Sequence, residues 1–232
     1  MNNESTYKKF INYFTKWEGA AGTGTGLLLV SFLCMWLGWA YSFLLFILSF
    51  PCLIGGIGFF FYGNIGRVSG EEIQNVIDRT AQTITFPELE EDSHLRKRTP
   101  KTYEEQIQIF TGYSMRQGVY VKKLSNASLR SSEYDVAKMV ELNDAFYIKT
   151  LRFSLISDEK ETAVYDVPFA SLEQIEVVRE RFSLTSGKNR FLAKTCHLVF
   201  TYDGGKQVLL PANDDIYTDE YAENLKRRFG IR

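Results

Sequence analysis

The charged residues are distributed so unevenly that they divide the chain into two parts. No Asp, Glu, Lys or Arg occurs from Gly19 to Gly66, and most residues in this stretch are apolar. A bilayer core accommodates about 20 helical residues, so the stretch is too long for one span, and tilt does not absorb the excess. We therefore expect a transmembrane hairpin over 19–66, with spans near 20–39 and 43–63 and a turn around Gly38–Ser42.

Basic residues on either side of this stretch predict its orientation. Lys8, Lys9 and Lys16 precede the first span and Arg67 and Arg79 follow the second, whereas the turn has no charge. The positive-inside rule places both termini in the cytoplasm. We therefore expect an integral protein of the cytoplasmic or plasma membrane. Residues 1–18 also intersperse aromatic residues with these lysines, which is typical of an interfacial helix contacting lipid. The alternative is a simple helical lead-in to the first span.

A glycine-rich segment opens the first span. Gly22 and Gly26 have the GxxxG spacing that permits close approach of another helix. The same segment resembles a phosphate-binding loop, but that motif needs a preceding strand and a following Lys-Ser/Thr, and here Leu27–Leu29 follow. We expect Gly22 and Gly26 to be helix-packing positions, with a plain flexible start of the span as the alternative, and we expect the hairpin to contact a protein partner or a second copy of the chain.

Residues 67–104 are predicted to form an amphipathic helix followed by a charged linker. From Gly70 onward, apolar residues recur at helical spacing on one face. The polar stretch that follows contains Arg96, Lys97 and Arg98, and juxtamembrane basic clusters attract anionic lipid. Between residues 88 and 101, four acidic residues balance the four basic ones, Lys101 included, so a solvated linker of mixed charge is the alternative to a membrane-surface contact.

The remaining 105–232 has the pattern of an antiparallel β domain closed by a helix. Cys196 to Tyr202 alternates with period two and returns after a turn at 203–206, and Val136 to Leu155 is typical of a second hairpin, with a bulge near Lys149–Thr150. A helix is predicted over 215–229, with Asp214 or Asp215 as its cap, Gly230 as its stop, and its apolar side on the sheet. Further strands are predicted at 107–115, 119–124, 163–169, 175–182 and 208–210.

Three stretches of this region carry a family resemblance. Ser128–Tyr134 before a hairpin, Val167–Val177 as strand, short turn and strand, and Val208–Pro211 before an acid-started helix resemble bacterial membrane-associated pleckstrin-homology-like (PH-like) domains over about 105–230. The resemblance implies an α+β membrane protein with a mainly antiparallel β PH-like domain capped by the terminal helix. Phosphoinositide-binding members use a basic loop between early strands, whose nearest equivalent here is the short pair Lys122-Lys123.

The sequence contains few candidate catalytic or metal-binding residues. Its three cysteines form no CxxC motif, and we predict no catalytic residue, cofactor or metal site. His94 is expected in solvent and His197 on a strand surface, next to Cys196 but on the opposite face. The acidic group 214–220 is expected to cap the terminal helix rather than bind a cation. A formal charge of −1 does not favour nucleic acid as a partner.

These observations favour a non-enzymatic, membrane-anchored module. The hairpin would hold the PH-like domain at the cytoplasmic membrane face, where it binds a protein or regulates a membrane complex. The first alternative is a structural subunit of an oligomeric transport or secretion assembly, since the spans carry glycine but no charge. The second alternative is a membrane-bound enzyme.

Overall fold

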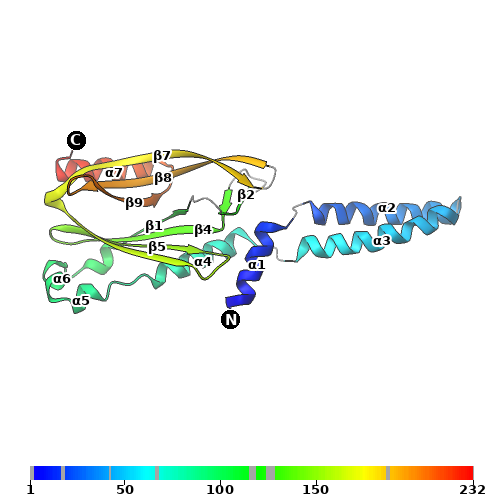
Figure 1. Ribbon diagram of the computed structural model, residues 1–232, viewed down its shortest axis with the longest axis horizontal. Helices are drawn as coiled ribbons and strands as arrows, with labels where there is room; N and C mark the ends of the chain where they lie inside the picture. Colours follow the sequence, from blue (N-terminus) through cyan, green and yellow to red (C-terminus); the bar gives the residue numbers. More distant parts are fainter. Residues whose placement is uncertain are drawn as a thin grey trace. The chain divides into compact units, whose positions relative to one another are not determined.

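A computed structural model describes residues 3–16, 19–41, 43–65, 68–114, 119–123, 129–186 and 189–231. Ser42 of the expected turn, Arg67 and Ser128 lie outside these ranges. The chain divides into two compact units, Met1–Ser69 and Gly70–Arg232. We call them the hairpin unit and the β domain and describe each by itself (Figure 1).

The hairpin unit contains the helices α1 (Asn3–Thr15), α2 (Ala20–Ala40) and α3 (Phe43–Asn64). Both α2 and α3 are long and apolar enough to cross a membrane, and most of their side chains are exposed in the isolated chain. They coincide with the two predicted spans to within a residue. The turn is shorter than predicted, because α2 continues through Gly38 to Ala40 before the chain reverses.

Small residues bring α2 and α3 together at several levels. A Cβ atom on Gly24 would lie 2.3 Å from the backbone nitrogen of Phe60, and one on Gly38 would lie 2.4 Å from that of Phe46. The buried hydroxyl of Ser31 donates a hydrogen bond of 2.8 Å to the carbonyl oxygen of Ser49. Close backbone approach and hydrogen bonding between helices are the features that hold membrane helices together, because apolar burial provides no driving force in lipid.

The β domain contains two antiparallel sheets in its described residues. The first has the order β1-β4-β5-β6 and the second the order β7-β8-β9. The strands are β1 (Gln108–Tyr113), β4 (Glu133–Glu141), β5 (Ala145–Ser154), β6 (Lys160–Pro168), β7 (Leu172–Ser186), β8 (Asn189–Tyr202) and β9 (Lys206–Ala212). The short strands β2 (Val121–Lys123) and β3 (Leu129–Ser131), which lie between β1 and β4 in the sequence, form a separate two-stranded sheet. Figure 1 shows the two larger sheets as two layers.

The main core lies between the two sheets, with helix α7 (Ile216–Phe229) packed against it. Phe146 of β5 is at its centre, with ring centroids 5.3 Å from Phe200 of β8 and 5.4 Å from Phe229 of α7. The α7 helix begins at Asp215, whose carboxylate accepts a hydrogen bond from the Thr218 amide, and ends at Gly230 in the left-handed conformation. The predicted cap and stop of this helix are therefore confirmed. Ala222 and Leu225 lie in the core, whereas Tyr217 at the start of the expected apolar side is 75% exposed.

Residues 70–104 belong to the β domain rather than to a separate linker. They form α4 (Gly70–Thr83), α5 (Glu88–Glu91), α6 (Ser93–Arg98) and the 3-10 turn η1 (Tyr103–Gln106). Phe86 and Leu89 pack with Val140 of β4 and Tyr147 of β5 in a second core cluster. The boundary expected near residue 105 thus differs from the boundary of the compact unit, which lies between residues 69 and 70.

This second cluster also accounts for the hydrophobic pattern of β5. We expected a bulge near Lys149–Thr150, because the apolar residues change face there, but β5 pairs with β4 and β6 in continuous register. The bulge prediction is wrong because β5 is buried on both faces, against the main core and against residues 86–89. Lys149 also donates a hydrogen bond of 2.6 Å to the carbonyl oxygen of Thr85, which holds this segment on the sheet.

Candidate functional site

A cleft of about 280 Å³ lies beside the main core of the β domain. Its walls come from α4, β1, β3, β4, β8, β9 and the residues that follow β9. We call it the Arg130 cleft and define it by six of the polar residues that line it, which are Arg130, Tyr134, Lys194, Thr195, His197 and Asp214. The two sheets approach closely at one point of its wall, because Gly112 of β1 has no side chain. A Cβ atom there would lie 2.7 Å from the Pro211 ring.

Several buried polar atoms of this cleft have no hydrogen-bond partner among the described residues. They are Arg130 Nε, the Tyr134 hydroxyl, the Thr195 hydroxyl and His197 Nδ1. Tyr134 is only 2% exposed and Thr195 only 6%. Buried polar atoms are almost always hydrogen-bonded, and each one left unpaired costs about 1–3 kcal/mol. The four residues that carry these atoms all line one cleft, which makes it the strongest candidate for a binding site in the domain.

Burial also determines the protonation of two of these groups. It raises the pKa of the Tyr134 phenol well above its usual range, although the nearby Arg130 charge offsets part of this effect. Burial lowers the pKa of His197, against the opposing influence of Asp135 and Glu180. At neutral pH the cleft therefore presents a phenol that can donate a hydrogen bond and a neutral imidazole.

The acidic residue of the cleft is already neutralised by a neighbouring base. Asp214 lies 2.6 Å from Nε of Arg179, whose Nη2 lies 2.7 Å from Asp219 at the start of α7. Hydrogen bonding to Arg179 holds the pKa of Asp214 below its usual range. Since Asp214 is paired in this way, Arg130 and Lys194 leave the cleft with a positive balance.

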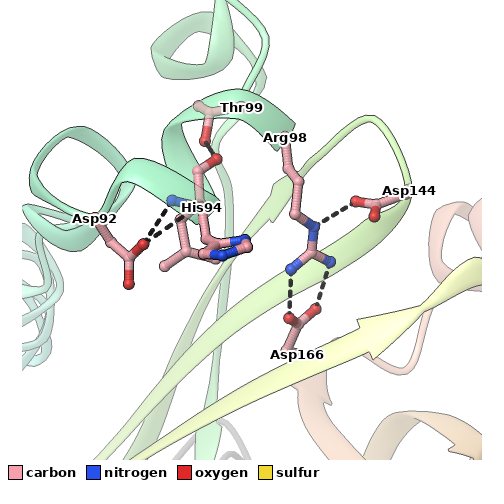
Figure 2. Close-up of polar contacts among 7 residues, drawn as sticks. Asp92, His94, Arg98, Thr99, Asp144 and Asp166 are labelled. Carbon is pink, nitrogen blue, oxygen red and sulfur yellow. Dashed lines mark hydrogen bonds and ion pairs between the residues drawn. The ribbon is translucent and has the colours of Figure 1, made fainter.

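Arg130 differs from three other arginines of the β domain, each of which bridges two carboxylates. Arg98 contacts Asp144 at 2.6 Å and Asp166 at 2.7 Å (Figure 2). The other two are Arg152 with Asp135 and Glu161, and Arg179 with Asp214 and Asp219. Among the described residues no carboxylate pairs in this way with Arg130. Its guanidinium lies close to the backbone at the start of α4. Gly70 leaves room for it, since a Cβ there would lie 2.8 Å from Nη2.

The residues predicted to contact the membrane surface have varied surroundings. Lys8 pairs with Glu4 one helical turn away, and Lys16 donates to the carbonyl oxygens of Tyr62 and Ile65 near the end of α3. Arg98 is held by Asp144 and Asp166, and Asp166 is the main reason why its pKa is raised. The side chains of Lys9, Arg96 and Lys97 belong to α1 and α6. For all six residues, lipid contact stays a prediction.

Neither predicted packing glycine takes part in the contact between α2 and α3. Gly22 and Gly26 have no atom within 4 Å of a hypothetical Cβ, whereas Gly24 between them is in tight contact. The GxxxG spacing places Gly22 and Gly26 together, but on a different side of α2 from the buried residues Ala20, Gly24, Ser31 and Gly38. Their role in packing against another chain stays a prediction.

The residues considered for catalysis or metal binding lie in surroundings that are typical of residues with a structural role. Cys196 is buried, which raises the pKa of its thiol and disfavours the nucleophilic thiolate. Within the described residues, no group of three or more His, Cys, Asp or Glu side chains gathers as metal ligands do. His94 follows Asp92, the residue that caps α6 (Figure 2). His197 is not on an open strand surface as expected but lies half-buried in the cleft.

Sequence reasoning missed the cleft because its residues come from distant positions with an ordinary pattern. Thr195 and His197 alternate with Cys196 and Leu198, and such alternation usually means that the polar face is in solvent. In the structure this polar face meets residues of the first sheet. Arg130 comes from a short strand with no periodic signal, and the two histidines of the chain drew attention only as catalytic candidates.

Comparisons of the chain with models of protein families, with curated proteins and with solved structures find no match. The functional argument therefore rests on the geometry of the chain itself.

Proposed function

We propose that the protein is a non-enzymatic, membrane-anchored module in which the apolar hairpin holds a PH-like β domain at the cytoplasmic face of the membrane. There the domain binds a protein partner or regulates a membrane complex. The order of two antiparallel sheets followed by a terminal helix supports the PH-like part of this proposal. The absence of a nucleophile paired with a base among the described residues that line the cleft is consistent with a non-enzymatic role.

The observation that carries the proposal is the surface of the hairpin. Large apolar side chains of α2 and α3 are exposed along both helices, including Leu29, Phe32, Leu33, Leu44, Ile54 and Phe61. Monomeric soluble proteins rarely expose a contiguous apolar patch of more than a few hundred Å². A bilayer is the environment that covers two adjacent helices of this length on all sides.

Cysteine labelling tests the anchoring and the orientation together. In a background with Cys34, Cys52 and Cys196 replaced by alanine, single cysteines are introduced at Tyr41, in the turn, and at Ser157, between β5 and β6. An impermeant maleimide should label Tyr41→Cys in intact cells and Ser157→Cys only after permeabilisation. Labelling of Ser157→Cys in intact cells would overturn the orientation, and extraction of the protein by alkaline carbonate would overturn the anchoring.

Purification in mild detergent tests the interaction part of the proposal. A protein that co-purifies in stoichiometric amount, and that is lost when the β domain is deleted, would support binding through this domain. A partner retained by the hairpin alone would instead support the structural-subunit alternative. Turnover of a substrate by the purified protein would contradict the non-enzymatic proposal.

One observation favours oligomerisation through the hairpin as a second candidate function. The Gly22 and Gly26 surface of α2 is not used within the hairpin, so it allows another helix to approach closely. Replacing both by leucine should shift the protein to a smaller species in light scattering, whereas Gly24→Leu should disrupt the hairpin itself. An unchanged particle mass in the Gly22/Gly26 double variant would exclude this surface.

A further inference from the structure

We propose that the Arg130 cleft binds a compact oxyanion of the phosphate class, either free phosphate and phosphate monoesters or the phosphate of a lipid headgroup. The inference goes beyond the proposed anchoring function and does not depend on it, because every group that carries it lies in the β domain.

The unpartnered atoms of the cleft share one chemical property, which is that each can donate a hydrogen bond. Arg130 Nε is an obligatory donor, the hydroxyls of Tyr134 and Thr195 donate or accept, and a neutral imidazole can carry its proton on Nδ1 of His197. Since burial keeps the Tyr134 phenol protonated, its proton is available to a ligand. A group rich in acceptor oxygens satisfies all of these atoms at once.

The charges of the cleft select an anion over a neutral acceptor. Arg130 and Lys194 are both lining residues, and the only described carboxylate among the lining residues, Asp214, is bound to Arg179. Arg98, Arg152 and Arg179 show that this domain elsewhere supplies carboxylates to its arginines. The Arg130 guanidinium lines the cleft without such a carboxylate pair among the described residues, so a bound anion would supply its counter-charge.

The number of donors and the size of the cleft favour phosphate over a carboxylate. A phosphate monoester carries a charge of about −1.5 to −2 and three acceptor oxygens, which matches two cations and several donors better than a singly charged carboxylate. Sites for drug-sized ligands are usually about 300–1,000 Å³, so a cleft of about 280 Å³ accommodates a compact group. Fork-shaped contacts from a guanidinium are well suited to phosphate oxygens.

Titration of the purified full-length protein in mild detergent tests this inference. The probes are inorganic phosphate and glycerol 3-phosphate, with acetate as the singly charged comparison, and binding is measured by calorimetry and by the shift of the unfolding temperature. Arg130→Gln should weaken phosphate binding about ten- to a hundredfold, because a charged donor is lost. Arg227→Gln, the same change at an exposed position of α7, should leave binding unchanged.

Tyr134→Phe keeps the test valid even if Arg130→Gln fails to fold. This change removes only a buried hydroxyl that makes no well-formed hydrogen bond in the described protein, although Arg130 and the Ser131 backbone lie close enough to lower its pKa, so the variant should fold about as well as the wild type. Its affinity for phosphate should nevertheless fall about fivefold. A structural role for the hydroxyl predicts the opposite result, with lower stability and unchanged binding.

Nanodiscs of phosphatidylcholine, with or without phosphatidic acid, identify the source of the phosphate. Stabilisation by glycerol 3-phosphate in detergent identifies a soluble ligand, and stabilisation only in phosphatidic acid discs identifies a headgroup. Either result supports the inference if Arg130→Gln and Tyr134→Phe weaken the stabilisation by the amounts expected above. The inference is overturned if no probe stabilises the protein, if both variants respond like the wild type, or if acetate binds as tightly as phosphate.

Discussion

Arg98 and Arg130 are two arginines of the same domain in opposite surroundings. Arg98 ends the short helix α6 and holds Asp144 of the β4–β5 turn and Asp166 of β6, so it ties a helix to a sheet (Figure 2). Arg130 comes from the short strand β3 and lies among hydroxyls and an imidazole in a cleft. All three nitrogens of the Arg98 guanidinium donate to carboxylates, whereas Arg130 has a buried nitrogen with no partner among the described residues.

The difference teaches how a structural ion pair is distinguished from a site for a ligand. A structural arginine leaves no donor unsatisfied, and its removal should cost stability in the absence of any ligand. An arginine held ready for a ligand contributes little to the stability of the free protein, because the cost of its unpaired atoms is recovered only on binding. The loss of stability caused by a change in the apolar core sets the scale against which changes at the two arginines are compared.

Leu225→Ala should have the largest effect. Leu225 of α7 is 6% exposed and packs in the main core, so its truncation should cost about 2–5 kcal/mol. Thermal unfolding of the full chain should show a decrease of many degrees, while phosphate binding to the remaining folded protein persists. A decrease below about 1 °C would mean that α7 does not cover the core, since a domain of this size loses about 2–4 °C per kcal/mol.

Arg98→Met should cost less than the core change but clearly more than any change at Arg130. Arg98 is 26% exposed, and its partners Asp144 and Asp166 are 60% and 40% exposed, so screening limits the loss to about 1–2 kcal/mol. Denaturant unfolding at low and high salt measures the effect, which should shrink as salt rises. Arg98→Lys should give an intermediate loss, because it keeps the charge but not the fork of donors. Equal stability of all three proteins would contradict a structural role.

His197 should make the stability of the β domain dependent on pH. Burial lowers the pKa of His197 below its usual value of 6.5, so the folded state disfavours the imidazolium. The corresponding stability is fully present above the unfolded pKa and is lost as the pH falls through the folded pKa, by about 1.4 kcal/mol for each unit between the two. His197→Gln should flatten the dependence over this window. Phosphate should flatten it as well, because an anion beside the imidazole favours its charged form.

The contrast between the two arginines also shows how far the sequence could lead. The helices α2, α3 and α7 were predictable, because a charge-free stretch and a cap-and-stop pattern each require only local information. Residues 86–101 were expected in a linker, since their charges cancel and nothing in them indicates that Phe86 and Leu89 are buried. The Arg130 cleft depends on β3 meeting β8, a long-range contact between polar residues that no local periodicity reveals.

Thr195→Val should stabilise the free protein by a small amount. The Thr195 hydroxyl is buried and has no hydrogen-bond partner among the described residues, and valine has nearly the same shape. Removing the cost of an unsatisfied hydroxyl should raise the stability by about 0.5–1 kcal/mol. Thr201→Val is the matched control, because Thr201 is also buried in β8 but its hydroxyl accepts a hydrogen bond from Gln207. That variant should lose stability, and the same response from both would remove the distinction between satisfied and unsatisfied groups.

Arg130→Gln should have the smallest effect on the stability of the free protein and therefore gives the sharpest comparison with Arg98. No described carboxylate is left unpaired by the change, and removal of the unsatisfied Nε offsets the packing lost with the half-buried side chain, so the net change should stay within about 0.5 kcal/mol. Unfolding in phosphate-free buffer should superimpose on the wild type, and the two curves should separate only when phosphate is added, because a ligand that binds the folded state stabilises it in proportion to the logarithm of its concentration. A loss in phosphate-free buffer as large as that of Arg98→Met would show that Arg130, too, is a structural arginine.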